Sequence, residues 1–246
     1  MNPLLDLDTM RASGRILAQV LETACAEWIR VGITPAEISE RADQAIRSHQ
    51  GAVPAFFGYN GFPAAACISV NDEILHGIPS QRKLQDGDIV RLDCGVALDG
   101  HYTDACRSVV LDPVPQRLRL LLKVTREALD KGIEAARVGN HIGDISYAIQ
   151  RHVERKGFKA SSDFTGHGIG HKLHMAPSIP NCGPPGQGEL ITEGVCFAIE
   201  PVIFDGPMGA RLRSDKWTIF SPTQTPSAHF EDTVIVTLFG PEVITR

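Results

Sequence analysis

Residues 86–104 read DGDIVRLDCGVALDGHYTD, and this stretch contains the strongest local signals for the fold. An Asp-Gly turn opens it, and the apolar residues that follow predict a largely buried strand that ends at the carboxylate of Asp93. The dipeptide Asp99-Gly100 is typical of a tight β-hairpin. We therefore expect Asp93 and Asp104 to lie on neighbouring antiparallel strands. If both side chains point to the same face of the sheet, the two carboxylates lie close together.

The strand that ends in an acid recurs later in the chain. In a repeat of the strand pattern, Asp86 corresponds to Glu193 and Asp93 to Glu200, each 107 positions later, and segments 31–39 and 138–146 are a third match at that offset. Short matches at one offset can arise by chance, but three with the same spacing favour duplication. The sequence therefore predicts two half-domains related by an approximate two-fold axis. Each half would place a strand that ends in an acidic residue at the centre of the domain.

The composition is that of one large domain. A chain of 246 residues can bury a sizeable core, and we expect two pseudo-symmetric halves over about 8–112 and 113–246. A net charge of −5 without a Lys/Arg stripe argues against nucleic acid and membrane partners. Residues Met1 to Asp8 carry acids where a signal peptide carries basic residues, so we expect a cytoplasmic protein.

The six cysteines are scattered without a Cys-x-x-Cys pair. This spacing suits reduced thiols better than a disulfide framework or a zinc ribbon. Cys94 adjoins Asp93, but no base is visible beside it, so a buried thiol is favoured over a nucleophile.

Hydrophobic periodicity predicts two pairs of helices. The first pair is expected over about 8–30 and from a capping box at Thr34–Glu37 to near Gly51. The second pair is expected through Leu118–Ile133 and over about 142–156. Short strands are expected at 67–70, 217–220 and 230–238, with a Pro/Gly loop at 177–188. Residues 52–80 are rich in Gly, Pro and aromatic residues, which suits a filled core gap or the wall of an apolar pocket.

Residues 166–171 read GHGIGH. The segment is too glycine-rich for a helix and lacks the strand-before, helix-after context of a dinucleotide-binding loop. We expect its glycines to allow close approach of the backbone.

Four acids and one histidine form a candidate metal-binding set: Asp93, Asp104, His167, Glu200 and Glu231. For any one acid, a solvated or salt-bridged role is favoured by about three to one. Together at the centre of a domain they would repel one another unless cations neutralised them. Two divalent ions bridged by carboxylates explain the set, and Mn, Fe or Co suits it as well as Zn.

The histidines have different contexts, and histidine is the side chain that moves protons near neutral pH. His167 lies between glycines and suits a metal ligand. His76 and His174 precede small or turn residues and could contact a substrate, whereas a surface position suits His171.

Several motifs resemble type I methionine aminopeptidase, in the short bacterial form, of peptidase family M24. They are Tyr59–Pro63, Cys67–Asp72, His76–Pro79, Gly166–Gly170, Ile199–Pro201 and Ser227–Thr233. The resemblance is collinear over nearly the whole chain. It implies the α+β pita-bread (creatinase/aminopeptidase) fold, in which two helix pairs cover a curved antiparallel sheet, and its pseudo-two-fold symmetry agrees with the repeat.

The resemblance also implies roles for the metal-binding set. Asp93 would chelate one ion, His167 and Glu200 the other, and Asp104 and Glu231 would bridge them.

The implied activity is removal of the amino-terminal methionine when the second residue is small. Glu200 would shuttle the proton and His174 would help to stabilise the oxyanion. The implied substrate-contacting residues are His76, His174, Tyr59, Phe62, Cys67 and Trp217. The implied partners are nascent polypeptide amino termini, with the ribosome as a candidate site of contact, and a monomer is expected.

Some positions depart from the family pattern. The family often has an aromatic residue at Leu173, acids at 175–176, Met at Val202 and Gln at His229. We expect Leu173, Val202 and His229 near the side-chain pocket, and therefore some tolerance for first residues other than methionine.

Two other functions stay open. A proline-specific peptidase of the same fold is favoured by the resemblance of Asp93–Arg107 to that group, and disfavoured by the absence of a large amino-terminal domain from the sequence. A catalytically silent binding protein would be expected to lack ligands.

Overall fold

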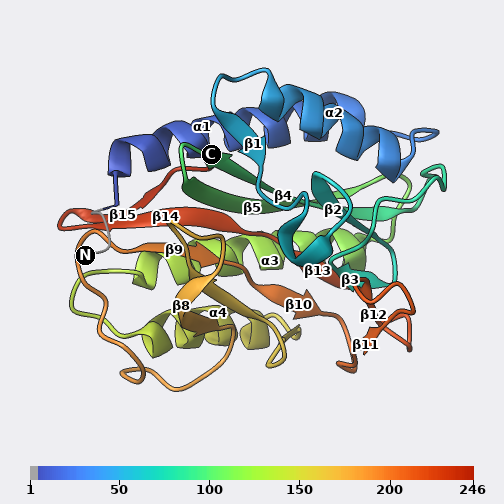
Figure 1. Ribbon diagram of the computed structural model, residues 1–246. Coiled ribbons are helices and arrows are strands. Elements are labelled where there is room, and N and C mark those ends of the chain that lie inside the picture. The colour runs from blue at the N-terminus through green and yellow to red at the C-terminus, as the bar shows by residue number, and fades with distance from the viewer. Residues whose placement is uncertain (1–4) are drawn as a thin grey trace.

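The computed structural model describes residues 5–246 (Figure 1). Helices α1 and α2 cover one side of the strands, and α3 and α4 cover the other. Their bounds are α1 Leu7–Thr23, α2 Pro35–Arg47, α3 Gln116–Ala135 and α4 Ile142–Arg155, with a π-helical turn at Ala24–Trp28 and a 3-10 turn at Tyr59–Gly61. This layering matches the expected two helix pairs around antiparallel strands.

The strands form two larger and two smaller sheets, and every pairing between them is antiparallel. The first half contributes β1 Ala52–Pro54, β2 Ala66–Val70, β3 Glu73–Leu75, β4 Ile89–Leu98 and β5 His101–Val110. The second contributes β6 Lys159–Ala160, β7 Thr165–Gly168, β8 Met175–Pro180, β9 Cys196–Ile199, β10 Val202–Phe204, β11 Arg211–Leu212, β12 Ile219–Phe220, β13 Ser227–His229, β14 Asp232–Thr237 and β15 Gly240–Val243. The larger sheets have the orders β1-β4-β2, with β5 on β4, and β15-β14-β9-β7-β8.

The hairpin predicted from residues 86–104 is confirmed as β4 and β5. Its turn residues have positive φ, 47° at Asp99 and 76° at Gly100, as a two-residue hairpin loop requires. Asp104 pairs with Gly95, which lies two residues from Asp93. Because side chains alternate along a strand, Asp93 and Asp104 lie on the same face.

The prediction that the first strand ends at Asp93 is wrong, because β4 continues to Leu98. Gly95 allows the continuation. A Cβ there would lie 2.9 Å from atoms of both Ala55 and Phe56, so only glycine lets the strand pass beneath them.

Two local backbone features recur at an offset of 107 residues. Gly32 and Gly139 have φ values of 90° and 91°. Each is followed by a helix whose first turn carries a capping box, at 34–37 in one half and 141–144 in the other. Each helix pair also packs on its own hydrophobic cluster. The division at residue 112 stays a prediction.

Three further elements differ from the sequence predictions. The first long helix changes to a π-helical turn at Ala24, and α2 ends at Arg47 rather than near Gly51. The expected loop at 177–188 begins within strand β8, whose prolines are tolerated because β8 is the last strand of its sheet.

All six cysteines are free. Within residues 5–246, no helix combines the length and the apolar character that crossing a membrane would require. The prediction about the amino-terminal acids concerns residues 1–8, of which 1–4 lie outside the described residues.

Candidate metal centre

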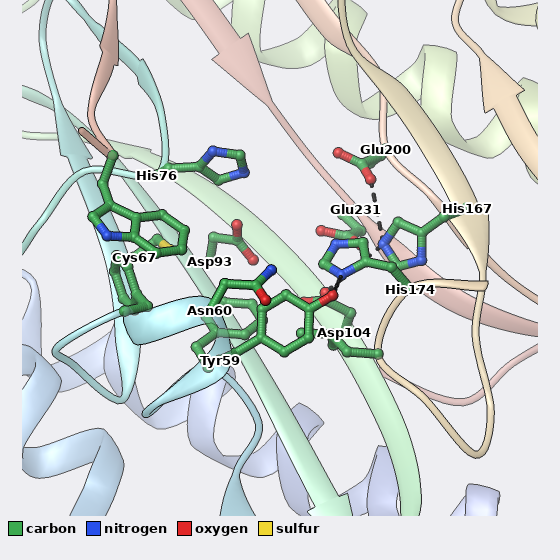
Figure 2. Close-up of a pocket in the computed structure, with 14 residues that line it drawn as sticks. Tyr59, Asn60, Cys67, His76, Asp93, Asp104, His167, His174, Glu200 and Glu231 are labelled. Atoms are coloured by element: carbon green, nitrogen blue, oxygen red, sulfur yellow. Dashed lines mark hydrogen bonds and ion pairs between the residues drawn. The ribbon is translucent and has the colours of Figure 1, made fainter. Parts of the chain in front are cut away.

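One cavity of about 230 Å³ lies between the two halves (Figure 2). It is lined by every predicted site residue: Tyr59, Phe62, Cys67, His76, Asp93, Asp104, His167, His174, Glu200, Trp217 and Glu231. Phe56, Asn60 and Leu173 complete the lining. The structure therefore brings together residues that are up to 172 positions apart in the sequence.

The candidate ligands come from both halves. Asp93 and Asp104 lie within the β4–β5 hairpin, and His167 lies in β7. Glu200 follows the last residue of β9, and Glu231 precedes β14. Strands therefore set the positions of all five, so the cluster is rigid.

The imidazole of His167 is oriented toward the acids. Its Nδ1 lies 3.0 Å from the carbonyl oxygen of Gly168, which can only accept a hydrogen bond, so Nδ1 carries the proton. Its Nε2 lies 4.0 Å from Asp104 Oδ2 and 3.6 Å from Glu200 Oε1. Burial lowers the pKa of His167 to about 4, which keeps the ring neutral, as metal ligation requires.

The acids lack the partners that buried carboxylates need. Oδ1 of Asp93, Oδ1 of Asp104 and Oε1 of Glu231 are buried and have no hydrogen-bond partner among the described residues. In the metal-free chain, burial raises the pKa of Asp93 to about 7 and that of Glu200 to about 8. Burial, and then the charge of neighbouring acids, raises the pKa of Asp104 and of Glu231 well above the usual range.

Divalent cations would resolve this arrangement. An unpaired buried carboxylate is costly, and an ion with open coordination positions supplies the missing partner. Asp104, His167 and Glu231 each offer a ligand atom within 4.8 Å of the others, and so do Glu200, His229 and Glu231. The two sets share Glu231, so the donors fit a metal centre with a bridging carboxylate.

The glycines beside His167 have the role expected from the sequence. A Cβ at Gly166 would lie 2.4 Å from the carbonyl oxygen of Ala198, and one at Gly168 would lie 2.2 Å from that of Ala176. Glycine at both positions lets β7 lie close to its neighbours and holds His167 at the acids.

Replacing Gly168 with alanine should push β7 away from β8 and displace His167. We expect a loss of about 1–3 kcal/mol in the free energy of unfolding, the usual cost of overpacking, together with weaker metal binding. Gly209→Ala is the control, because a Cβ at Gly209 would meet nothing within 4 Å. Equal melting temperatures and equal metal affinities for the two variants would contradict the prediction.

The wall opposite the acids is apolar and aromatic. The rings of Phe62 and Trp217 meet edge to face with centroids 5.1 Å apart. Tyr59 and His174 close the mouth of the cavity, where the hydroxyl oxygen of Tyr59 lies 2.8 Å from Nδ1 of His174. The His174 ring also lies over that of His167, with centroids 4.3 Å apart.

His76 reaches the cavity from a left-handed backbone conformation, with φ 55°. The following Gly77 fits against β2, where a Cβ would lie 2.5 Å from the carbonyl oxygen of Ile68. This close contact fixes the turn that points His76 at the acids.

Leu173 lines the cavity as expected, whereas Val202 and His229 do not line it. Val202 is fully buried against Ile74 and Leu75, because β10 runs behind the site. Asn60 also lines the cavity, although it was not among the predicted site residues. Its backbone is left-handed, with φ 48°. The dipeptide Asn60-Gly61, typical of tight turns, was the available signal.

A buried cluster of carboxylates and imidazoles that opens into an apolar pocket defines a metal-dependent enzyme. The chain matches metallopeptidase family M24 over residues 8–238. It is 42% identical over 240 residues to the methionine aminopeptidase of Clostridium perfringens, covering 98% of this chain and 96% of the relative. It is 39% identical over 241 residues to methionine aminopeptidase 1 of Bacillus subtilis, covering 98% and 96%.

Solved structures agree with these relatives. The crystal structure of methionine aminopeptidase from Rickettsia prowazekii superposes with a TM-score of 0.94 at 38% identity, covering 98% of this chain and 96% of that one. The prolidase from Pyrococcus furiosus superposes with a TM-score of 0.77 at 21% identity, covering 98% and 63%, which shows the fold alone. The chain belongs to metallopeptidase family M24 and has the pita-bread fold.

Proposed function

We propose that this protein is a methionine aminopeptidase, which hydrolyses the first peptide bond of chains that begin with methionine and have a small second residue. The observation that supports the proposal most strongly is the cavity itself. Its lining contains the full predicted ligand set together with an apolar and aromatic wall. A catalytically silent binding protein would not need unpartnered buried carboxylates.

Two divalent ions, drawn from Mn, Fe, Co and Zn, complete the proposed site. Asp93 would hold one ion, His167 and Glu200 would hold the other, and Asp104 and Glu231 would be shared between them. When bound, the ions supply Lewis-acid polarisation of the scissile carbonyl and lower the pKa of water.

The chain's own residues position the substrate and move the proton. Glu200 accepts the proton of the attacking water and passes it to the leaving amine. With the Tyr59 hydroxyl as the donor to Nδ1 of His174, Nε2 would carry a proton toward the developing oxyanion. His76, which lies across the cavity from His174, would contact the substrate backbone.

Specificity is proposed to come from the apolar wall. Tyr59, Phe62, Cys67 and Trp217, with Leu173, form a narrow surface suited to the polarisable thioether of methionine. The proposed partners are nascent polypeptide amino termini, reached by a monomer in the cytoplasm, with the ribosome as a candidate contact.

Metal-reconstituted protein assayed on Met-Ala-Ser, Leu-Ala-Ser, Lys-Ala-Ser and Ala-Pro tests this function. We expect Met-Ala-Ser to be cleaved fastest and Leu-Ala-Ser more slowly, with kcat/KM lower by roughly 10–200-fold, because an apolar pocket discriminates shape by only a few kcal/mol. Equal rates for Met and Lys first residues would refute an apolar pocket. Preferential hydrolysis of Ala-Pro would indicate the proline-specific alternative, and metal binding without turnover would indicate a silent protein.

A further inference from the structure

His229 is a second buried imidazole beside the metal-binding set. It ends β13, is 1% exposed and does not line the cavity. Its backbone is fully engaged, since its N–H donates to Ser108 Oγ and its carbonyl accepts from the same hydroxyl. Its ring is not engaged, because neither Nδ1 nor Nε2 has a hydrogen-bond partner among the described residues.

The ring of His229 approaches the acids as closely as His167 does. Its Nε2 lies 3.6 Å from Glu200 Oε2 and 3.9 Å from Glu231 Oε2. The corresponding distances from His167 Nε2 are 4.0 Å to Asp104 Oδ2 and 3.6 Å to Glu200 Oε1. Glu200 thus presents one oxygen to each imidazole.

These separations suit a shared ion rather than direct hydrogen bonds. Two ligand atoms that each lie about 2.0–2.2 Å from one ion are roughly 3–4 Å apart, whereas a nitrogen-to-oxygen hydrogen bond is about 2.7–3.2 Å long. A buried imidazole without a partner is unfavourable, and an ion would supply one. Ligation through Nε2 would also fix the tautomer of a ring that no protein group fixes.

We infer that His229 is a sixth metal ligand, so that each of the two ions has one imidazole donor. One ion would take its nitrogen from His167 and the other from His229, with Glu231 shared between them. Glu200, which holds the His167 ion, would also reach the His229 ion, since each of its oxygens faces one imidazole. In the family pattern this position is often glutamine, so an imidazole at this position is a departure from that pattern. The inference rests on the two-ion proposal above.

The second imidazole should change which metals the protein prefers. Imidazole suits Zn, Fe and other later divalent metals, whereas an all-oxygen set suits Mn and Mg. The ion next to His229 should therefore be bound more tightly, and with less preference for Mn, than an ion held by carboxylates alone.

The test compares wild-type protein with His229→Gln, which restores the family's amide. His49→Gln is the matched control, because His49 does not line the cavity and belongs to neither set of ligand atoms. Each metal-free protein is titrated with Co(II) by calorimetry, and the proton NMR spectrum of the loaded protein is recorded. A Co(II)-bound imidazole gives a strongly shifted N–H signal, so the count of such signals reports the ligating histidines.

We expect two bound ions and two shifted N–H signals in wild type and in His49→Gln. His229→Gln should lose one signal and bind one ion about 100-fold more weakly, at least the loss seen when a metal site loses a supporting group. Two ions bound with equal affinity and one signal in every protein would overturn the inference and leave the two-ion function intact. Failure of wild type to bind two ions would overturn both.

A measurement on wild type alone covers the case in which His229→Gln does not fold. Protein labelled with ¹⁵N only at histidine is titrated with Zn(II), and the ring nitrogen signals are followed. If the signals of two ring nitrogens shift to the position of metal-bound imidazole, the inference is supported. If only one signal shifts, the inference is overturned.

Discussion

Asp104→Asn should abolish tight binding of both metal ions and with it the peptidase activity. Asp104 lies beside Asp93 on the hairpin, and the ligand atoms of Asp104, His167 and Glu231 lie within 4.8 Å of one another. Its Oδ1 has no hydrogen-bond partner among residues 5–246. An amide has the same shape but no charge to share between two cations. We therefore expect affinity for each ion to fall by about 100-fold or more, as calorimetry would measure.

The same substitution should not weaken the metal-free protein. Burial, and then the charge of Asp93, raises the pKa of Asp104 and so disfavours its ionised form, and a neutral amide therefore costs the metal-free protein little. Metal should raise the melting temperature of wild type, as any ligand of the folded state does, and should fail to raise that of the variant. Asp99→Asn, in the turn of the same hairpin, is the control and should behave as wild type. Unchanged metal content in Asp104→Asn would remove Asp104 from the centre.

His174→Ala should keep both ions and still lose on the order of 10²–10³ in kcat, the usual cost of deleting one hydrogen-bond donor to the transition state. His174 lies at the mouth of the cavity and belongs to neither set of candidate ligand atoms. Metal stoichiometry and kcat measured on the same preparation check the prediction.

His167→Ala provides the contrast, because it removes a candidate ligand and should lower metal affinity and activity together. Tyr59→Phe should cause a smaller loss than His174→Ala, since it removes only the hydroxyl that orients the His174 ring. If His174→Ala lost metal while His167→Ala retained it, the two roles would be reversed.

The hairpin shows how far the sequence alone leads. Its turn residues fix the pairing of Leu98 with His101, and from that pairing the alternation of side chains places Asp93 and Asp104 on one face. The capping box before α2 and the glycines around His167 are equally local signals. Each depends on a few adjacent residues, so each can be predicted without the rest of the chain.

Positions that depend on packing between distant segments could not be predicted. The family pattern predicts positions near the pocket for Val202 and His229, but neither side chain lines the cavity. The strands that carry them, β10 and β13, pair with each other, and no local pattern reveals that pairing. Strand β8 was missed because its prolines argue against a strand, and only its neighbour β7 makes an edge position available. The order of strands around β9 likewise depends on contacts across the whole second half.

The candidate ligands lie within strands or directly next to them, whereas much of the apolar wall lies between strands, at Tyr59, Phe62, Leu173 and Trp217. Backbone hydrogen bonds resist any shift of a strand, whereas the side chains of the wall are held mainly by packing against one another. Substrate preference in this chain can therefore drift through mutation of the wall while reactivity is conserved. Selection for a new first residue would be met by changes at these loop positions, without rebuilding the metal centre.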